Sequence, residues 1–287
     1  AVDVTFTEME EKTGRRFGRW VLQKGQIVYR RDDGGLICVA EGRVARTPRR
    51  TKSGKGKSSS ASKPDAPAAS TEPTSYEPGE PDATRRGADR RAWESVAVGD
   101  AVGPMSQPLT LNRIFQWYAG AQGALHYGGT HGDAVRYRQR HDDYEINHET
   151  GAKDSAARGH FSSKEGKDVG MGGAYDVGLH RIAWVSALVT DWMGDDAHLA
   201  EVDVDVLRPN IVGDTTYLSG VVTDRWVDGN SFIGIEIEGR NQSNVVTTRG
   251  RAMVSLPSLE RGPVALPLFG GDSGRWTNPP EPASSQS

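Results

Sequence analysis

The sequence has few of the residues and segments that mark secreted and membrane proteins. Cys38 is the single cysteine among 287 residues, so no disulfide can form within the chain, which excludes a disulfide-built domain. No apolar run reaches the ~18 residues that a membrane-spanning helix needs. Residues 1–6 lack the basic and apolar regions of a signal peptide. These absences predict a soluble, cytoplasmic protein with no membrane span.

An excess of positive charge is absent as well. Lys and Arg total 35 against 38 for Asp and Glu, which gives a formal net charge of −3 and a pI near 6.2. A basic cluster at residues 49–63 has no interleaved aromatic residue and is followed by an acidic stretch. We therefore interpret it as part of a solvated tether and expect no nucleic-acid partner.

Apolar residues are scarce in one segment in particular. Residues 47–91 contain no Val, Ile, Leu, Phe or Trp, and Tyr76 is their only aromatic residue. Such a stretch cannot bury enough apolar surface to offset the entropy lost on ordering it. The composition predicts a disordered linker over residues 47–92 and a C-terminal tail over residues 259–287, the latter rich in Gly, Pro and Ser.

The first 46 residues carry strand patterns only. Residues 26–30 and 36–46 flank the turn Asp32-Asp33-Gly34-Gly35, which predicts a hairpin, and residues 19–23 predict one more strand. Three short strands are too few to bury a stable core alone. We expect this part to pack on something else.

The region after the linker predicts an α+β fold. A strand at 105–110 leads into a helix at 111–121, an irregular stretch at 123–167 and a long apolar helix at 173–193. Four strands follow, at 200–207, 215–226, 231–241 and 245–256. Trp184 and Trp192 lie on one face of the long helix and are expected in the core. The order indicates an antiparallel sheet wrapped around one long central helix.

Three segments within residues 93–258 carry a resemblance to a known family. They read RPNIVGDTTYLSGVV from residue 208, GRNQSNVVTTRGRAMVSLP from residue 239 and TLNRIFQWYAGAQGALHYGG from residue 110. In this order and spacing they resemble the MaoC-like acyl-CoA hydratase/dehydratase family, which has the hotdog fold. The resemblance covers residues 94–257, and each motif alone is only moderately specific.

Residues 11–47 are similar to the last strands of the first hotdog in double-hotdog dehydratases. The central helix and first strands of that hotdog are absent from the sequence, which implies a partial second hotdog at residues 1–46. Either the chain begins inside a domain, or a partner chain completes it. An exposed half-sheet would leave unpaired edges and a bare apolar face. We therefore expect a homo- or hetero-oligomer with another hotdog subunit.

The resemblance implies addition of water to 2-enoyl-CoA thioesters, or its reverse on 3-hydroxyacyl-CoA, in fatty acid or lipid metabolism. Water is the only cosubstrate and no redox cofactor is implied. In the family an Asp and a His hold and deprotonate the water. His126 matches the histidine, but the position of the Asp, five residues earlier, is Ala121. One positioned acid/base group contributes about 100- to 10,000-fold in rate, so this departure matters.

Three explanations for Ala121 stay open. A carboxylate elsewhere in the irregular stretch takes over, with Asp133 and Asp142 the first candidates, followed by Asp143 and Glu145. A partner subunit supplies the working site and this chain binds acyl-CoA without catalysing the reaction. Or His126 is a structural histidine. A further alternative is an acyl-CoA thioesterase, for which Asp176 is the only near carboxylate.

The resemblance also implies an oxyanion site at the start of the long helix. The run Gly170-Met171-Gly172-Gly173 lets backbone approach a ligand closely, and helix N-terminal N–H groups favour negative charge. We assign substrate binding to Gly172, Gly173, Ala174 and Tyr127, and place Tyr175 and Asp176 in the first helical turn. A plain glycine-rich helix entry is the alternative. The histidines between residues 126 and 160 show no HxxxH or HxH spacing, so no metal site is expected.

Overall fold

The described residues of the computed structural model form two compact units. The structure describes residues 1–14, 18–46, 85–121, 136–137, 139–141, 145–147, 150–154 and 156–266. The first unit holds residues 1–46 and the second holds the described residues from 85 onward. Most of the predicted linker and most of the predicted tail lie outside these ranges.

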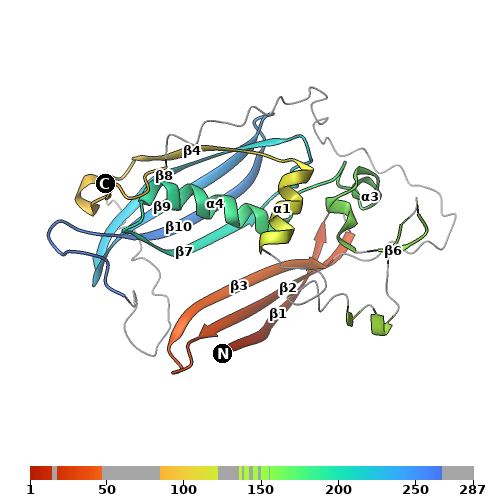
Figure 1. Cartoon of the computed structure of the whole chain (residues 1–287), viewed down its shortest axis with the longest axis horizontal. Helices are drawn as coiled ribbons and strands as arrows, with labels where there is room; N and C mark the ends of the chain where they lie inside the picture. Colours follow the sequence, from red (N-terminus) through yellow and green to blue (C-terminus); the bar gives the residue numbers. More distant parts are fainter. Residues whose placement is uncertain are drawn as a thin grey trace. The chain divides into compact units, whose positions relative to one another are not determined.

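The first unit is a three-stranded antiparallel sheet in the order β1-β2-β3, with strands Val2–Gly14, Gly18–Arg30 and Leu36–Arg46 (Figure 1). Val2 pairs with Tyr29 and Val4 with Ile27, so these four side chains share one face. Val2 and Val4 are 58% and 74% exposed. One face of this sheet therefore carries exposed apolar side chains.

The sequence prediction for this unit was correct for β3 and incomplete elsewhere. The two strands predicted at 19–23 and 26–30 are one continuous strand, β2, because Gly25 continues the ladder opposite Phe6 and Gly42. β1 was not predicted, although its alternation of Val2, Val4 and Phe6 with polar residues is the period of a strand.

The second unit is built on a five-stranded antiparallel sheet in the order β4-β8-β9-β10-β7. Its strands are β4 (Ala101–Pro108), β7 (His198–Val206), β8 (Thr215–Asp228), β9 (Asn230–Asn241) and β10 (Val246–Leu256). On β9, Ile233, Ile235 and Ile237 are buried while Glu236 between them is exposed. This alternation presents one apolar face of the sheet to the core.

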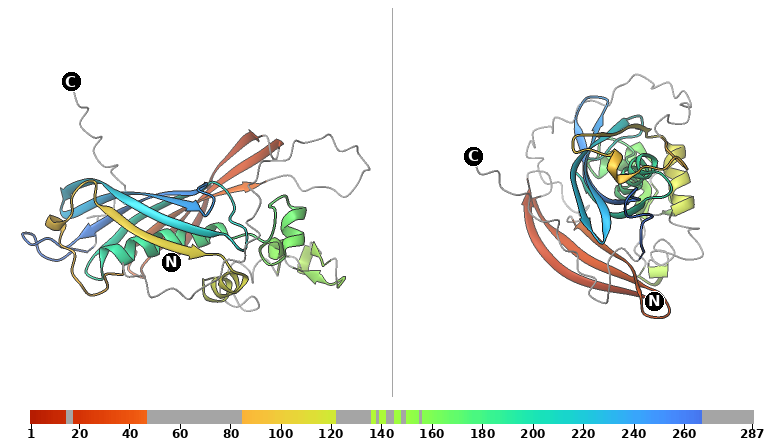
Figure 2. Two further views of the ribbon diagram at one scale, coloured as in Figure 1. Left: turned by 90° about the horizontal axis from the view of Figure 1, so that it is seen from above. Right: turned by 90° about the vertical axis from the view of Figure 1, so that its left-hand side faces the viewer.

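The helix α4 (Gly178–Met193) fills the concave side of this sheet and contacts β4, β7, β8 and β10. Figure 2 shows the strands curving around the helix. Its buried side chains recur three and four residues apart, which places them on the faces that meet the sheet. They include Trp184, Val185, Leu188, Val189 and Trp192. Both tryptophans are 6% exposed, which confirms the prediction that they belong to the core.

Shorter elements stand between β4 and α4. The helix α1 (Leu111–Ala121) has the predicted bounds. Residues 123–167 were predicted to be irregular, but their described part contains several short elements, and residues 136–137 and 139–141 are helical as well. The short elements are β5 (Glu145–Ile146), β6 (Lys153–Asp154), the 3-10 helix η2 (Ala156–His160) and α3 (Ser163–Asp168).

Residues at both borders of the predicted domain are anchored to it. Arg86 donates its backbone N–H to the backbone carbonyl of Asp191 (2.8 Å), and Arg91 Nε donates to the backbone carbonyl of Trp192 (2.8 Å). A second 3-10 helix, η1 (Trp93–Ser95), follows, and its Glu94 accepts from the backbone N–H of Leu259 (2.9 Å). Part of the predicted linker therefore contacts α4, and the start of the predicted tail contacts η1. Of the helices in the described ranges, none combines the length and apolar character of a membrane span.

Replacing Leu188 with alanine should destabilise the second unit strongly. Leu188 is 1% exposed, and removing a buried leucine side chain costs about 2–5 kcal/mol. Leu179→Ala on the same helix is the control, because Leu179 is 54% exposed and should change stability by less than about 0.5 kcal/mol. Urea denaturation of both variants measures the difference. Equal losses would contradict the assignment of α4 as the core helix.

Candidate functional site

The glycine-rich segment before α4 is an extended loop, so the predicted helix start at residue 173 is wrong. The helix begins at Gly178, and Gly172 has a φ of 89°, outside the helical region. Tyr175 forms an antiparallel bridge with Ile211, and Asp176 donates its backbone N–H to the carbonyl of Asn210 (3.0 Å). This pairing holds Tyr175 and Asp176 extended, outside the first helical turn.

The loop is packed against α3 through backbone atoms. A Cβ on Gly166 would lie 1.9 Å from the carbonyl oxygen of Gly173, so α3 approaches only because residue 166 has no side chain. On the other side, a Cβ on Gly173 would lie 2.8 Å from Cγ2 of Ile211. The loop therefore runs between α3 and the segment that contains Ile211.

The three predicted oxyanion residues differ in what they can offer a ligand. Gly172 is exposed, whereas Gly173 and Ala174 are buried. The N–H of Ala174 is directed at Ser163 Oγ (3.4 Å), and its carbonyl accepts from Val212 (2.8 Å). Of these three residues, Gly172 is therefore the one open to solvent.

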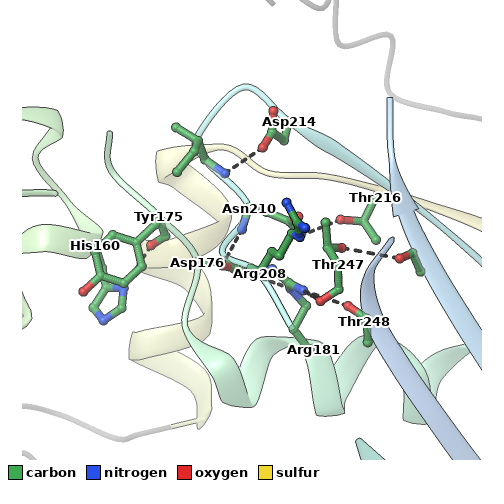
Figure 3. A network of polar contacts seen from close by, with 12 residues as sticks. His160, Tyr175, Asp176, Arg181, Arg208, Asn210, Asp214, Thr216, Thr247 and Thr248 are labelled. Carbon is green, nitrogen blue, oxygen red and sulfur yellow. Dashed lines mark hydrogen bonds and ion pairs between the residues drawn. The ribbon is translucent and has the colours of Figure 1, made fainter. Parts of the chain in front are cut away.

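Behind the loop lies a buried ion pair between Asp176 and Arg181 (Figure 3). Asp176 is 4% exposed and Arg181 is fully buried. One carboxylate oxygen accepts from Arg181 Nε, and the other accepts from the backbone N–H of Asn210 (3.0 Å). Burial raises the pKa of Asp176, and the guanidinium opposes that rise.

The remaining nitrogens of Arg181 reach two other segments. Nη1 donates to the carbonyl of Thr247 (2.9 Å) and to Thr248 Oγ1 (2.7 Å) on β10. Nη2 donates to the carbonyl of Arg208 (2.8 Å). One side chain thus ties the first turn of α4 to β10 and to the loop between β7 and β8.

The motif that contributes most to the family resemblance, Arg208–Asp214, forms that β7–β8 loop. Asp214 accepts from the backbone N–H of Ile211 (2.8 Å) and from Gln242 Nε2 (2.7 Å). The side-chain amide of Asn210 lies 2.6 Å from Thr216 Oγ1. These residues hold the loop in the shape that receives Tyr175 and Asp176.

An aromatic cluster joins α1, η2 and the loop before α4. His160, at the end of η2, lies with its ring 4.3 Å from that of Tyr175 and 6.3 Å from that of Tyr118 on α1. His160 Nδ1 is 2.9 Å from the carbonyl oxygen of Tyr175. Burial lowers the pKa of His160 and raises the pKa of Tyr118 to about 12. The ring of His160 is therefore held in a half-buried place beside the glycine loop.

A second histidine lies in the first turn of α4. His180 is 5% exposed, with its ring between those of Trp117 (5.4 Å) and Trp184 (4.9 Å). Its Nδ1 has no hydrogen-bond partner among the described residues. Burial, then the charges of Arg113 and Arg181, lower its pKa to about 4.

The structure describes only part of the predicted site. His126, Tyr127, Asp133, Asp142 and Asp143 lie outside the described residues, and Glu145 is described only as the backbone of β5. The described site brings Tyr175, the residue after Gly172, Gly173 and Ala174, against His160, which sequence reasoning left unassigned. No spacing signal could have found it, because η2 and the loop meet only in the folded chain. Within the described ranges, no three His, Cys, Asp or Glu side chains are grouped as metal ligands.

Comparison with known proteins rests on the fold alone. No protein-family model matches this sequence, and no curated protein does so either. A solved MaoC-like dehydratase matches 89% of this chain over 69% of its own, at 15% identity and a TM-score of 0.56. A putative MaoC domain protein dehydratase from Chloroflexus aurantiacus matches 90% of this chain over 70% of its own, at 13% identity and a TM-score of 0.51.

The chain has the hotdog fold, which it shares with these two solved structures. R-hydratase PhaJ1 from Pseudomonas aeruginosa also matches, over 58% of this chain and 86% of its own, at 15% identity and a TM-score of 0.41. The comparisons confirm the predicted fold class, in which one central helix lies inside an antiparallel sheet. In this hotdog fold, α4 is the central helix and the glycine loop directly precedes it.

Removing Arg181 should be far more damaging than removing an exposed arginine. Arg181→Ala leaves Asp176 buried without its counter-charge, which costs about 3–5 kcal/mol. Arg251→Ala is the matched control, since Arg251 pairs with Asp203 at 3.3 Å on the exposed surface of β7 and β10, where a pair is worth about 0–1 kcal/mol. Denaturant unfolding compares the two. A small loss for Arg181→Ala would mean that the pair is not the anchor described here.

His180 should make stability depend on pH below neutrality. Its pKa is about 4 in the folded chain against 6.5 for an unperturbed histidine, so the unfolded chain binds the extra proton first. Stability from this group is full above pH 6.5 and falls as the pH drops toward 4, by about 1.4 kcal/mol per unit. His180→Phe should flatten that slope of unfolding free energy against pH, and the exposed His198→Gln should not. An unchanged slope in His180→Phe would contradict the assignment.

Proposed function

We propose that the chain hydrates 2-enoyl-CoA thioesters or dehydrates 3-hydroxyacyl-CoA. The observation that carries this proposal is the glycine loop anchored at the entry of the central helix of a MaoC-like hotdog fold. Two solved structures that share this fold are described as dehydratases, one of them as putative. The sequence motifs at residues 110–129 and 208–222 support the same chemistry.

In the proposed reaction, backbone N–H groups of the loop polarise the thioester carbonyl, and Gly172 is the exposed candidate donor. His126 acts as an acid/base residue, with Tyr127 beside it in the sequence as a substrate contact. Asp133 and Asp142 are the carboxylates that the sequence offers in place of the one missing at Ala121. Water is the only cosubstrate.

A non-catalytic role is the principal alternative. The exposed apolar side chains on one face of the first unit support the proposal that another hotdog subunit, identical or paralogous, covers that sheet. In that assembly the chain would bind acyl-CoA or complete a heteromeric dehydratase. The alternative predicts activity only when the second subunit is added.

The thioesterase alternative is weakened by the position of Asp176. Its carboxylate is buried and accepts from both Arg181 and Asn210. A hydrolytic carboxylate must reach the thioester or its water. Asp176 therefore acts in the fold, and we propose no hydrolysis through it.

Hydration of crotonyl-CoA by the purified chain tests the proposal. We expect loss of the enoyl absorbance with time, and a fall in kcat of about 100-fold or more in His126→Ala, because a positioned acid/base group contributes at least that much. The exposed His141→Ala is the control and should retain wild-type kcat.

The assay is run at a measured oligomeric state, alone and with a candidate hotdog subunit. Full activity in His126→Ala would exclude the proposed role of this residue. Acyl-CoA binding without turnover by the chain alone, followed by turnover with the added subunit, would favour the heteromeric alternative.

A further inference from the structure

His160 has a hydrogen-bonding pattern that leaves one ring nitrogen available. Its Nδ1 lies 2.9 Å from the carbonyl oxygen of Tyr175, and a carbonyl can only accept, so Nδ1 carries the hydrogen. In the neutral ring Nε2 is then an acceptor. No hydrogen bond joins Nε2 to another described residue. A histidine whose tautomer is fixed in this way can accept a proton at Nε2.

The anchor of His160 belongs to the candidate oxyanion loop. Tyr175 directly follows Gly172, Gly173 and Ala174, and its own ring lies tilted against the imidazole, with the ring centres 4.3 Å apart. The contact therefore fixes the distance between the imidazole and the loop that would hold the thioester oxygen. Half-burial between Tyr118 and Tyr175 keeps the ring away from bulk water while leaving part of it accessible.

We propose that His160 is a catalytic acid/base residue of the hydration reaction and fills the role of the carboxylate missing at Ala121. This inference rests on the proposed function. His160 then holds and deprotonates the water, which is part of the work that the family resemblance assigns to an Asp and a His.

The proposed step neither gains nor loses a proton overall. As the water oxygen bonds to C3 of the enoyl thioester, the C2–C3 π bond breaks and a water proton passes to Nε2. The imidazolium then returns a proton to C2, which leaves a 3-hydroxyacyl thioester and a neutral His160. Hydrogen-bond donors of the loop stabilise the negative charge that forms on the thioester oxygen in between. No oxidant or reductant is needed.

Two other described histidines, His180 and His141, fit this role less well. His180 is enclosed by Trp117 and Trp184 and lies close to two arginine charges. His141 makes the same kind of backbone contact as His160, with Nδ1 2.8 Å from the carbonyl of Tyr137, but on an exposed surface. His141 is therefore a matched control, because it makes the same backbone hydrogen bond but is exposed to solvent.

The decisive variant is His160→Asn. An asparagine amide can take the position of Nδ1 and keep the hydrogen bond to Tyr175, but it cannot accept a proton. A purely structural His160 predicts wild-type kcat in this variant. The catalytic role predicts an unchanged melting temperature, a KM within about threefold of wild type and a kcat lower by about 100-fold or more. His141→Asn should retain wild-type values for all three.

The pH profile of kcat gives a readout that a structural role would not move. A general base must be neutral, so kcat should rise with pH through a pKa below 6.5, since burial lowers the pKa of His160. The other titratable groups facing the ring are Tyr118, Tyr175 and Asp176, the last held by Arg181. The acid limb should persist in His141→Asn and disappear from the residual activity of His160→Asn.

The wild-type chain offers a test that does not depend on a folded variant. With ¹⁵N-labelled histidine, binding of 3-hydroxybutyryl-CoA should shift the Nε2 resonance of His160 and leave that of His141 in place. Two results would overturn this inference alone, provided that the wild-type chain hydrates the substrate. One is a full kcat in His160→Asn, and the other is an Nε2 resonance of His160 that does not shift. A wild-type chain that binds acyl-CoA but never hydrates it overturns this inference and the proposed function together.

Discussion

The second unit depends on keeping one buried guanidinium fully paired. Arg181 sits inside the molecule on α4, where an unpaired charge would cost several kcal/mol. Its nitrogens contact Asp176, the Thr247 carbonyl, Thr248 and the Arg208 carbonyl. These groups belong to the loop before α4, to β10 and to the β7–β8 loop. Breaking any one contact leaves part of the buried guanidinium unpaired, so the three segments are held together through Arg181.

This coupling explains why the loop before α4 is extended. Asp176 can reach Arg181 and the N–H of Asn210 at once only if the residues before it run alongside the β7–β8 loop. A helix starting at residue 173 would place Asp176 in the first turn and remove the pairing between Tyr175 and Ile211. The ion pair and the strand-like pairing therefore outweigh the dipole energy that an acidic residue gains in a first helical turn, about 0.3–1 kcal/mol.

Local patterns in the sequence predict the second unit well and its site poorly. The four strands after α4 and the bounds of α1 follow from periodicity and turn residues, because each depends on neighbours within a few positions. The start of α4 does not follow from local patterns, because the contacts of Asp176 with Arg181 and Asn210 decide it. The environment of His160 depends on Tyr175, which lies 15 residues away in the sequence. β1 was visible in the alternation of Val2 and Val4 and was missed.

The contact between Gly166 and Gly173 restricts how this region can vary. The two backbones meet without side chains, so no change of rotamer can adjust the spacing between α3 and the loop. Only glycine fits at position 166 while α3 keeps its present contact with the loop. A related chain with any larger residue there must hold α3 farther away and leave Ala174 uncovered.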